Sequence, residues 1–149
     1  MAIARGAGTE IIRTAHFENI DDTVQYLIIG EQHHIYTILS IITQKNAEES
    51  AGNKLSLFLE GYDSKAGDSN EAISICQFAP ALYGTFVWND KFSFNGFEPV
   101  NFSGPLDNAT KQNAIADQGS SVSQKLKCNA AEGDDQFELT ITYIDQNNA

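Results

Sequence analysis

Short runs of β-branched and aromatic residues recur along the chain, and this recurrence most constrains how the chain can fold. Clusters of Gly, Asn, Asp and Pro separate the runs at short intervals, which is typical of strands joined by turns. The pattern predicts an all-β fold: a two-sheet antiparallel β-sandwich, jelly-roll-like. The predicted strands are residues 9–18, 24–30, 34–45, 54–62, 73–79, 85–90, 92–96, 123–130 and 137–145.

The last of these segments, FELTITYID, shows the cleanest alternation. Phe137, Leu139, Ile141 and Tyr143 fall on one face, and the polar residues between them fall on the other. This predicts a strand with one face in the core and one face in solvent. Residues 55–60 alternate in a similar way, whereas residues 35–42 are apolar on both faces and favour a central strand.

The chain has the length of one domain. We predict an N-terminal arm at residues 1–8 and a single β-sandwich domain at 9–149. The segment 104–121 is predicted to be one long loop or a short helix, with Asp107 or Asn108 as the N-cap and Gly119 as the stop. Connections of this length are often functional, so the segment is a candidate contact element.

The net charge of the chain limits the kinds of partner that it can bind. Nine Lys and Arg stand against twenty Asp and Glu, which gives a formal net charge of −11, and such a chain repels polyphosphate. We therefore expect no nucleic-acid partner. Without an apolar run of about 20 residues or an export signal at its start, the chain is expected to be intracellular and to contact no membrane.

The two cysteines, Cys76 and Cys128, each lie in an apolar, strand-like setting. Free cysteine in such a setting behaves as a small buried hydrophobe. Two reduced thiols are expected, and a disulfide between them is the alternative.

The residue patterns do not support catalysis or metal binding. His33 and His34 are adjacent, so on a strand they would point to opposite faces, and neither they nor His16 belong to a known zinc motif. We expect structural or surface roles for the histidines, with a pH-sensitive interface as the alternative. Segment 63–71 could supply calcium ligands but lacks the EF-hand spacing.

The acidic pairs Asp21-Asp22 and Asp134-Asp135 are explained by turns. Motifs for a serine nucleophile, for nucleotide binding and for a catalytic carboxylate pair are all missing from the sequence. We therefore predict a non-enzyme with no catalytic residues, no metal ligands and no cofactor.

The stretch TFVWNDKFSFNGFEP at residues 85–99 is rich in aromatic rings. We interpret it as a core hairpin that turns at residues 89–91, with Phe86, Trp88, Phe92 and Phe94 facing inward. Phe97 lies beyond the hairpin and is expected to face another chain. An exposed aromatic platform for carbohydrate is the alternative.

Several segments carry a resemblance to a known family. The chain opens with the glycine-containing arm ARGAGTE, continues through HHIYTILSI and LSLFLEG, carries FVWNDKF, and ends with a strand containing YIDQ. In these structural patterns, which span most of the chain, it resembles small virion structural proteins of tailed bacteriophages, particularly those of cyanobacterial and other marine phages. Residues 104–121 fit the pattern least.

The resemblance implies a capsid decoration (cement) protein that bridges neighbouring major capsid subunits, with a head–tail connector, a tail component or a carbohydrate-binding module as alternatives. It implies a homotrimer whose partners are the major capsid protein or other virion proteins, located in the virion after assembly in the host cytoplasm. The expected partner-binding residues are Arg5, Phe97, Pro99, Phe102 and Leu106.

Overall fold

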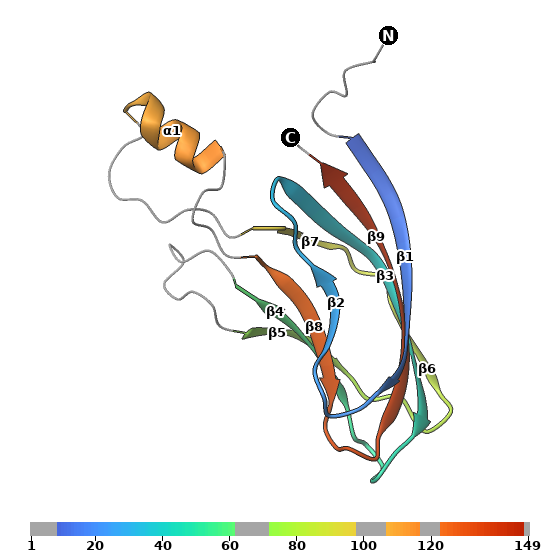
Figure 1. Cartoon of the computed structure of the whole chain (residues 1–149). Coiled ribbons are helices and arrows are strands. Elements are labelled where there is room, and N and C mark those ends of the chain that lie inside the picture. Colours follow the sequence, from blue (N-terminus) through green and yellow to red (C-terminus); the bar gives the residue numbers. More distant parts are fainter. Residues whose placement is uncertain (1–8, 62–71, 98–106, 117–122, 148–149) are drawn as a thin grey trace.

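The computed structural model describes residues 9–61, 72–97, 107–116 and 123–147 of the 149-residue chain (Figure 1). The described residues form strands at all the predicted positions and one short helix. In chain order the elements are β1 (Thr9–Ile20), β2 (Gln25–Ile29), β3 (His34–Ala47), β4 (Leu55–Glu60), β5 (Ala72–Phe78), β6 (Thr85–Trp88), β7 (Phe92–Asn95), α1 (Ala109–Ala116), β8 (Lys125–Ala130) and β9 (Gln136–Asn147).

The strands form two antiparallel sheets that face each other. Sheet A has the order β1-β9-β3-β6, with β7 also paired to β3, and sheet B has the order β2-β8-β4-β5. The pairs are nested: β1 with β9, β2 with β8, β3 with β6 and β7, and β4 with β5. Such nesting folds the chain as one long hairpin whose strands alternate between two sheets, which is the order of a jelly roll. The predicted all-β sandwich is confirmed.

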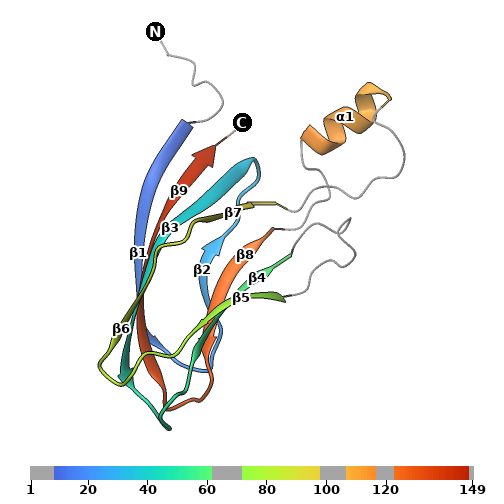
Figure 2. The same ribbon diagram turned by 180° about the vertical axis from the view of Figure 1, so that it is seen from behind.

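The predicted hairpin at residues 85–96 is wrong. β6 pairs with residues 41–44 of β3 and β7 pairs with residues 35–38, both antiparallel. The two strands therefore follow each other along one edge of β3, and residues 89–91 interrupt this edge without reversing the chain (Figure 2). The reason is that β3 is long enough to hydrogen-bond both short strands.

The aromatic rings of β6 and β7 do face the space between the sheets. Phe94 is buried, and Trp88 and Phe92 pack against the core. Phe86 remains 39 % exposed, but its ring lies 4.9 Å from that of Phe78 on β5. The expected inward direction of these rings is therefore confirmed, with Phe86 at the margin of the core.

The core lies between the sheets and follows the predicted alternation. In β9, Phe137, Leu139 and Ile141 are fully buried. Residues 35–42 lie in a central strand, as expected, because β3 has β9 on one edge and β6 and β7 on the other. Ile42, on the outer face of sheet A, is nevertheless 38 % exposed. The buried apolar residues are Ile20, Leu27, Ile28, Tyr36, Ile38, Ile41, Leu55, Leu57, Phe78, Phe94, Leu126, Cys128, Ala130, Phe137, Leu139 and Ile141.

The helix α1 confirms the short helix expected within residues 104–121. The Asn108 side-chain oxygen accepts a hydrogen bond from the Lys111 backbone N–H at 2.9 Å, so Asn108 is the N-cap. The expected stop, Gly119, lies outside the described residues. No helix in the described ranges is long and apolar enough to span a membrane.

The two cysteines are free thiols, as expected. Cys76 on β5 and Cys128 on β8 both lie opposite Leu57 of β4, one on each side of that strand. Two strand spacings amount to about 9.6 Å, which exceeds the Cα separation that a disulfide can bridge. Burial raises the pKa of Cys76 to about 11 and that of Cys128 to about 12.

These thiols should react very slowly in the folded protein. At pH 8 the raised pKa lowers the thiolate fraction of Cys76 roughly 100-fold, and Cys128 is fully buried as well. We expect iodoacetamide to modify both residues rapidly in denaturant without reductant and neither of them at a comparable rate in buffer. Mass spectrometry of the labelled chain checks this, and rapid labelling of Cys128 in buffer would contradict its position in the core.

Candidate functional site

A polar pocket of about 230 Å³ lies at the end of the sandwich where β2 and β9 end and β3 begins. It combines an apolar wall from β2 with charged and phenolic side chains from sheet A and the β2–β3 turn. We call it the Asp145 pocket. Its lining residues are Arg13, Leu27, Ile28, Ile29, Glu31, Tyr36, Tyr143 and Asp145.

The strand register explains why polar residues gather there. Asp145 continues the inward-facing positions of β9 after Ile141 and Tyr143. Arg13 of β1 lies opposite Tyr143, and Tyr36 of β3 lies opposite Asp145. Alternation therefore directs these side chains into the space between the sheets, at the end where the apolar core stops.

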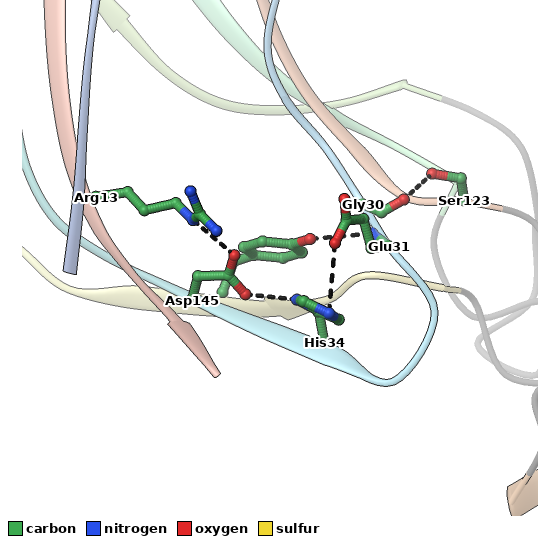
Figure 3. Close-up of polar contacts among 7 residues, drawn as sticks. Arg13, Gly30, Glu31, His34, Ser123 and Asp145 are labelled. Carbon is green, nitrogen blue, oxygen red and sulfur yellow. Dashed lines mark hydrogen bonds and ion pairs between the residues drawn. The ribbon is translucent and has the colours of Figure 1, made fainter. Parts of the chain in front are cut away.

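Asp145 joins three strands through its two carboxylate oxygens (Figure 3). Arg13 Nε donates to Oδ2 at 2.9 Å, and His34 Nδ1–H donates to Oδ1 at 2.5 Å. The Asp145 side chain is only 7 % exposed, whereas that of Arg13 is 50 % exposed. The hydrogen bond to Asp145 is the main cause that raises the pKa of Arg13.

The β2–β3 turn completes the pocket. Glu31 Oε2 lies 3.4 Å from His34 Nε2, and the Glu31 backbone N–H donates to the Tyr36 hydroxyl at 3.0 Å (Figure 3). Burial raises the pKa of Tyr36 to about 12 and also raises that of Tyr143, whose ring meets the Tyr36 ring edge-on at 6.0 Å. Both phenols stay neutral at ordinary pH.

The raised pKa values of buried groups predict alkaline sensitivity. Cys76, Cys128 and Tyr36 hold their protons more tightly in the folded chain than in the unfolded chain. The unfolded chain therefore loses these protons first, and the stability present below about pH 9 is lost as the pH rises towards 12. Urea midpoints across this range should fall, and they should fall less steeply in Cys128→Ala. A flat profile would contradict the burial of these groups.

The arrangement links β1, β3 and β9 through polar side-chain contacts. The residues that line the pocket include no Ser, Thr or Cys. Ser123, at the same end, donates its hydroxyl to the Gly30 carbonyl at 2.7 Å (Figure 3). Among the described residues, no group of three or more His, Cys, Asp or Glu is placed to hold a metal ion.

A backbone seam beside the pocket joins the two sheets. Gly30 N–H donates to the Gln124 carbonyl, Gln124 N–H to the Gly96 carbonyl, and Gly96 N–H to the His34 carbonyl, at 2.7–2.8 Å. The main chain of Phe97 then forms an isolated bridge with Ser123. The seam therefore continues the end of β7 across to the start of β8.

The predicted partner-binding residues fall mostly outside the described ranges. Arg5, Pro99, Phe102 and Leu106 lie in segments that the structure does not describe. Phe97 is described: it is partly buried and its backbone belongs to the seam at the pocket end. Its contact with another chain stays a prediction.

The histidines occupy three separate settings. His33 lies in the β2–β3 turn with φ of 65°, and His34 begins β3, where the predicted strand also begins. His16 lies on the outer face of sheet A, where its Nδ1 is 2.8 Å from Thr140 Oγ1. The expected structural and surface roles fit these positions.

The acidic pairs lie in turns, as expected, and Asp135 also connects two loops. Asp21 accepts a hydrogen bond from the Thr23 backbone N–H at 2.8 Å. Asp135 is fully buried and accepts from the backbone N–H groups of Glu49 and Glu132 and from the Asn53 side chain. It therefore ties the β3–β4 loop to the β8–β9 loop. The calcium candidate at 63–71 lies outside the described residues.

The Trp88 ring is not placed as an exposed platform for carbohydrate. Trp88 points between the sheets, where its ring meets that of Phe78 edge-on at 6.2 Å. A ring in this position cannot stack on a sugar from solvent.

The Asp145 pocket was not predicted from the sequence, although one signal for it is present there. Asp145 occupies the same alternation phase as the core residues of β9, so it is an acidic residue at a core position. Such a residue requires a buried partner. Nothing local in the sequence identifies Arg13, which is 132 residues away.

Removing the Asp145 carboxylate should loosen this end of the sandwich. Asp145→Ala leaves His34 and Arg13 without their shared acceptor, and we expect the free energy of unfolding to fall by about 2 kcal/mol. Urea denaturation followed by circular dichroism measures this. Glu10→Ala, an exposed carboxylate near the same end of β1, is the control and should change stability by less than about 0.5 kcal/mol. Equal effects of the two variants would show that the contacts of Asp145 do not stabilise this end of the sandwich.

The sequence matches no protein-family model and no curated protein. Solved structures with weak similarity to this chain include the following three. A chain of the disulfide-linked pili that form Bacillus endospore appendages has 10 % identity and a TM-score of 0.43 over 100 % of this chain and 97 % of that chain. A chain of the cowpea mosaic virus top component, a naturally occurring empty particle, has 13 % identity and a TM-score of 0.36 over 95 % and 87 %. A chain of tomato aspermy virus has 12 % identity and a TM-score of 0.30 over 96 % and 80 %.

These neighbours are structural proteins of virus particles and of a pilus. Similarity at these identities and TM-scores does not transfer a function from one chain to another.

Proposed function

We propose that this protein is a non-enzymatic structural subunit of a virus particle, and more specifically a capsid decoration protein of a tailed bacteriophage. In this role it bridges neighbouring major capsid subunits and stabilises the shell, acting as a homotrimer in the virion after assembly in the host cytoplasm. The alternative roles are a head–tail connector, a tail component or a carbohydrate-binding β-sandwich module. The proposal includes no cofactor, nucleic acid or membrane.

The observation that carries the proposal is the outer face of sheet A. Its middle rows present hydroxyl and aliphatic side chains with no Asp, Glu, Lys or Arg among them, in a chain with twenty acidic residues. We call it the threonine face. Its described members are Ile12, Thr14, His16, Thr37, Ser40, Ile42, Val87, Ser93, Thr140, Thr142 and Ile144.

The threonine face has the composition of a contact surface. Ile12 is 69 % exposed and Val87 is 49 % exposed. Hydroxyl pairs cross the strands between such residues, with Thr14 and Thr142 oxygens 3.3 Å apart. Glu10 borders the face at one end, and Glu18 and Glu138 border it at the other, 3.7 and 4.0 Å from the His16 ring. An uncharged centre with a charged rim is the usual anatomy of a protein interface.

A decoration protein stabilises the shell through the binding energy of its contacts alone. A specific contact buries about 1,200–2,000 Å² in total, and each contact across neighbouring shell subunits must be broken before the shell can fail. The jelly-roll order agrees with this role, since many capsid domains share it, although the same fold serves other functions as well.

Co-sedimentation tests the proposal. Purified protein should bind expanded phage capsids that lack it, and the double variant Ile12→Glu with Thr142→Glu should bind roughly tenfold more weakly or worse, because it places charge at the centre of the contact. Ala51→Glu, in the exposed β3–β4 loop, adds a charge elsewhere and should bind like wild type. Deletion of residues 1–8 should also weaken binding if the arm takes part.

Failure of the wild-type protein to bind such capsids would overturn the decoration role. Equal binding by the Ile12→Glu, Thr142→Glu variant would show that the threonine face is not the contact. Labelling of intact particles with antibody separates the shell from the tail as the location.

A further inference from the structure

The outer face of sheet B differs sharply from the threonine face. Lys125 and Lys127 project from β8 on this side, because Leu126 and Cys128 between them point into the core. Lys54 lies at the margin, with Nζ 3.2 Å from Gln77 Oε1. Three of the seven Lys and Arg within the described residues are therefore on one sheet face.

Aromatic and aliphatic side chains lie between these lysines. Tyr26 is 40 % exposed and Ile29 is 60 % exposed on β2, and Lys125 Nζ lies 5.8 Å from the centroid of the Tyr26 ring. Glu60 is the acidic residue on this face, and its Oε2 lies 3.4 Å from Lys127 Nζ. We call this surface the lysine face; its members are Tyr26, Ile29, Lys54, Phe58, Glu60, Lys125 and Lys127.

The opposite charge is concentrated at one end of the sandwich. The β1–β2, β3–β4 and β8–β9 loops meet there, as shown by hydrogen bonds from Ala130 N–H to the Asp21 carbonyl and from Glu49 N–H to the Asp135 carboxylate. We call this end the acidic tip. It carries Asp21, Asp22, Glu48, Glu49, Glu132, Asp134 and Asp135.

Among the described residues, the acids of the tip outnumber the cations near them. Lys45, near the end of β3, is fully buried and already paired with Glu48 at 3.0 Å. Lys54 lies in the β3–β4 loop, but its Nζ is 3.2 Å from Gln77 Oε1, at the margin of the lysine face. Repulsion from Glu132 is the main cause that raises the pKa of Glu49, with burial, Asp134 and Asp135 adding to it. Exposed acids at this end therefore repel one another, and a cationic surface brought against them would relieve that repulsion.

We propose that two copies of this chain associate by placing the acidic tip of one copy on the lysine face of the next. The contact joins two different surfaces of the chain, so a third copy can continue it, and closure after three contacts gives the trimer of the proposed function. Tyr26 and Ile29 supply the apolar area of the contact, and Val24, 44 % exposed next to the acidic loops, faces them from the tip.

A second copy is the occupant that the charges favour. A net charge of −11 makes most orientations of two copies repulsive, and the lysine face is the described surface on which acidic loops meet several cations. The attraction is between exposed charges, so added salt should weaken it.

Sedimentation velocity of the isolated chain tests the inference through charge reversal. The face variant carries Lys125→Glu and Lys127→Glu, and the tip variant replaces the four exposed acids of the tip, Asp22, Glu49, Glu132 and Asp134, with lysine. Wild type should associate in a concentration-dependent manner at low salt and less at high salt. Each variant alone should associate roughly tenfold more weakly or worse, because its tip and its face then carry the same sign of charge.

Mixing the two variants should restore association. The acidic tip of the face variant meets the lysine face of the tip variant, and the reversed tip meets the reversed face, so both mixed contacts are attractive. The matched control carries Lys91→Glu and Lys111→Glu, which change the net charge as much as the face variant does but lie elsewhere; it should associate at most slightly less than wild type.

Three results would overturn the inference: a wild-type chain that stays monomeric at low salt, variants that associate like wild type, or a mixture no stronger than its components. The inference rests on the proposed function for the expected number of three copies, but the sedimentation test needs no capsid. Capsid binding without charge-dependent self-association would remove the inference alone, whereas self-association without capsid binding would remove the proposed function alone.

Discussion

Replacing Gly96 with alanine should be among the most damaging single changes in this chain. A methyl group at Gly96 would overlap the backbone carbonyl oxygen of Glu31 and come within 2.9 Å of its nitrogen. Backbone atoms cannot move aside like the end of a flexible side chain, so the seam between Gly30, Gly96 and Gln124 would have to separate. We expect the free energy of unfolding to fall by about 3 kcal/mol or more.

Urea denaturation of Gly96→Ala, followed by tryptophan fluorescence, measures this loss. Gly133→Ala is the matched control, since its methyl group would meet only the Asp22 side chain at an ordinary 3.5 Å. That control should stay within about 1 kcal/mol of wild type or gain slightly. If Gly96→Ala unfolds at the same urea concentration as wild type, the close approach at the seam is refuted.

Replacing Lys45 with methionine should have a similarly large effect at the opposite end. Lys45 is fully buried, with Nζ 2.7 Å from the Asn53 carbonyl and 3.0 Å from Glu48 Oε2, and it lies 5.5 Å from the Phe137 ring. Methionine keeps the length of the side chain but leaves the carboxylate and the carbonyl without their donor. Removing one partner of a buried ion pair costs about 3–5 kcal/mol.

The same denaturation assay applies, with Lys91→Met as the control. Lys91 is exposed between β6 and β7, so its loss should cost less than about 0.5 kcal/mol. The double variant Lys45→Met with Glu48→Gln should recover part of the loss, because the unpaired charge is gone. A Lys45→Met protein as stable as wild type would mean that Glu48 and Asn53 find other partners.

Much of the fold was predictable because alternation is a local property. Phe137, Leu139 and Ile141 lie within five residues of each other and identify the inner face of β9. Predicting this face therefore needs no knowledge of distant contacts. The Asn108 cap likewise acts on Lys111 three residues away. The strands, the short helix and the two-sheet architecture therefore agree with the sequence-based predictions.

The failures concern partners that are far apart in sequence. Residues 85–95 resemble a hairpin because aromatic residues flank a polar turn. In the structure, however, both strands pair with the edge of β3 and not with each other. The Asp145 pocket depends on the same pairing, since only the register of β1 and β3 on β9 brings Arg13 and His34 to one carboxylate.

By itself, the sequence determined which segments are extended, which of their faces are apolar, and that the chain carries a large negative charge. Tertiary structure alone decided which strands are neighbours, that polar residues at core positions converge on Asp145, and that lysines gather on one sheet while acids gather at one end. The physical reason is that side-chain direction follows from the dihedral angles of each residue, whereas strand neighbours are chosen by hydrogen bonding and packing over the whole chain.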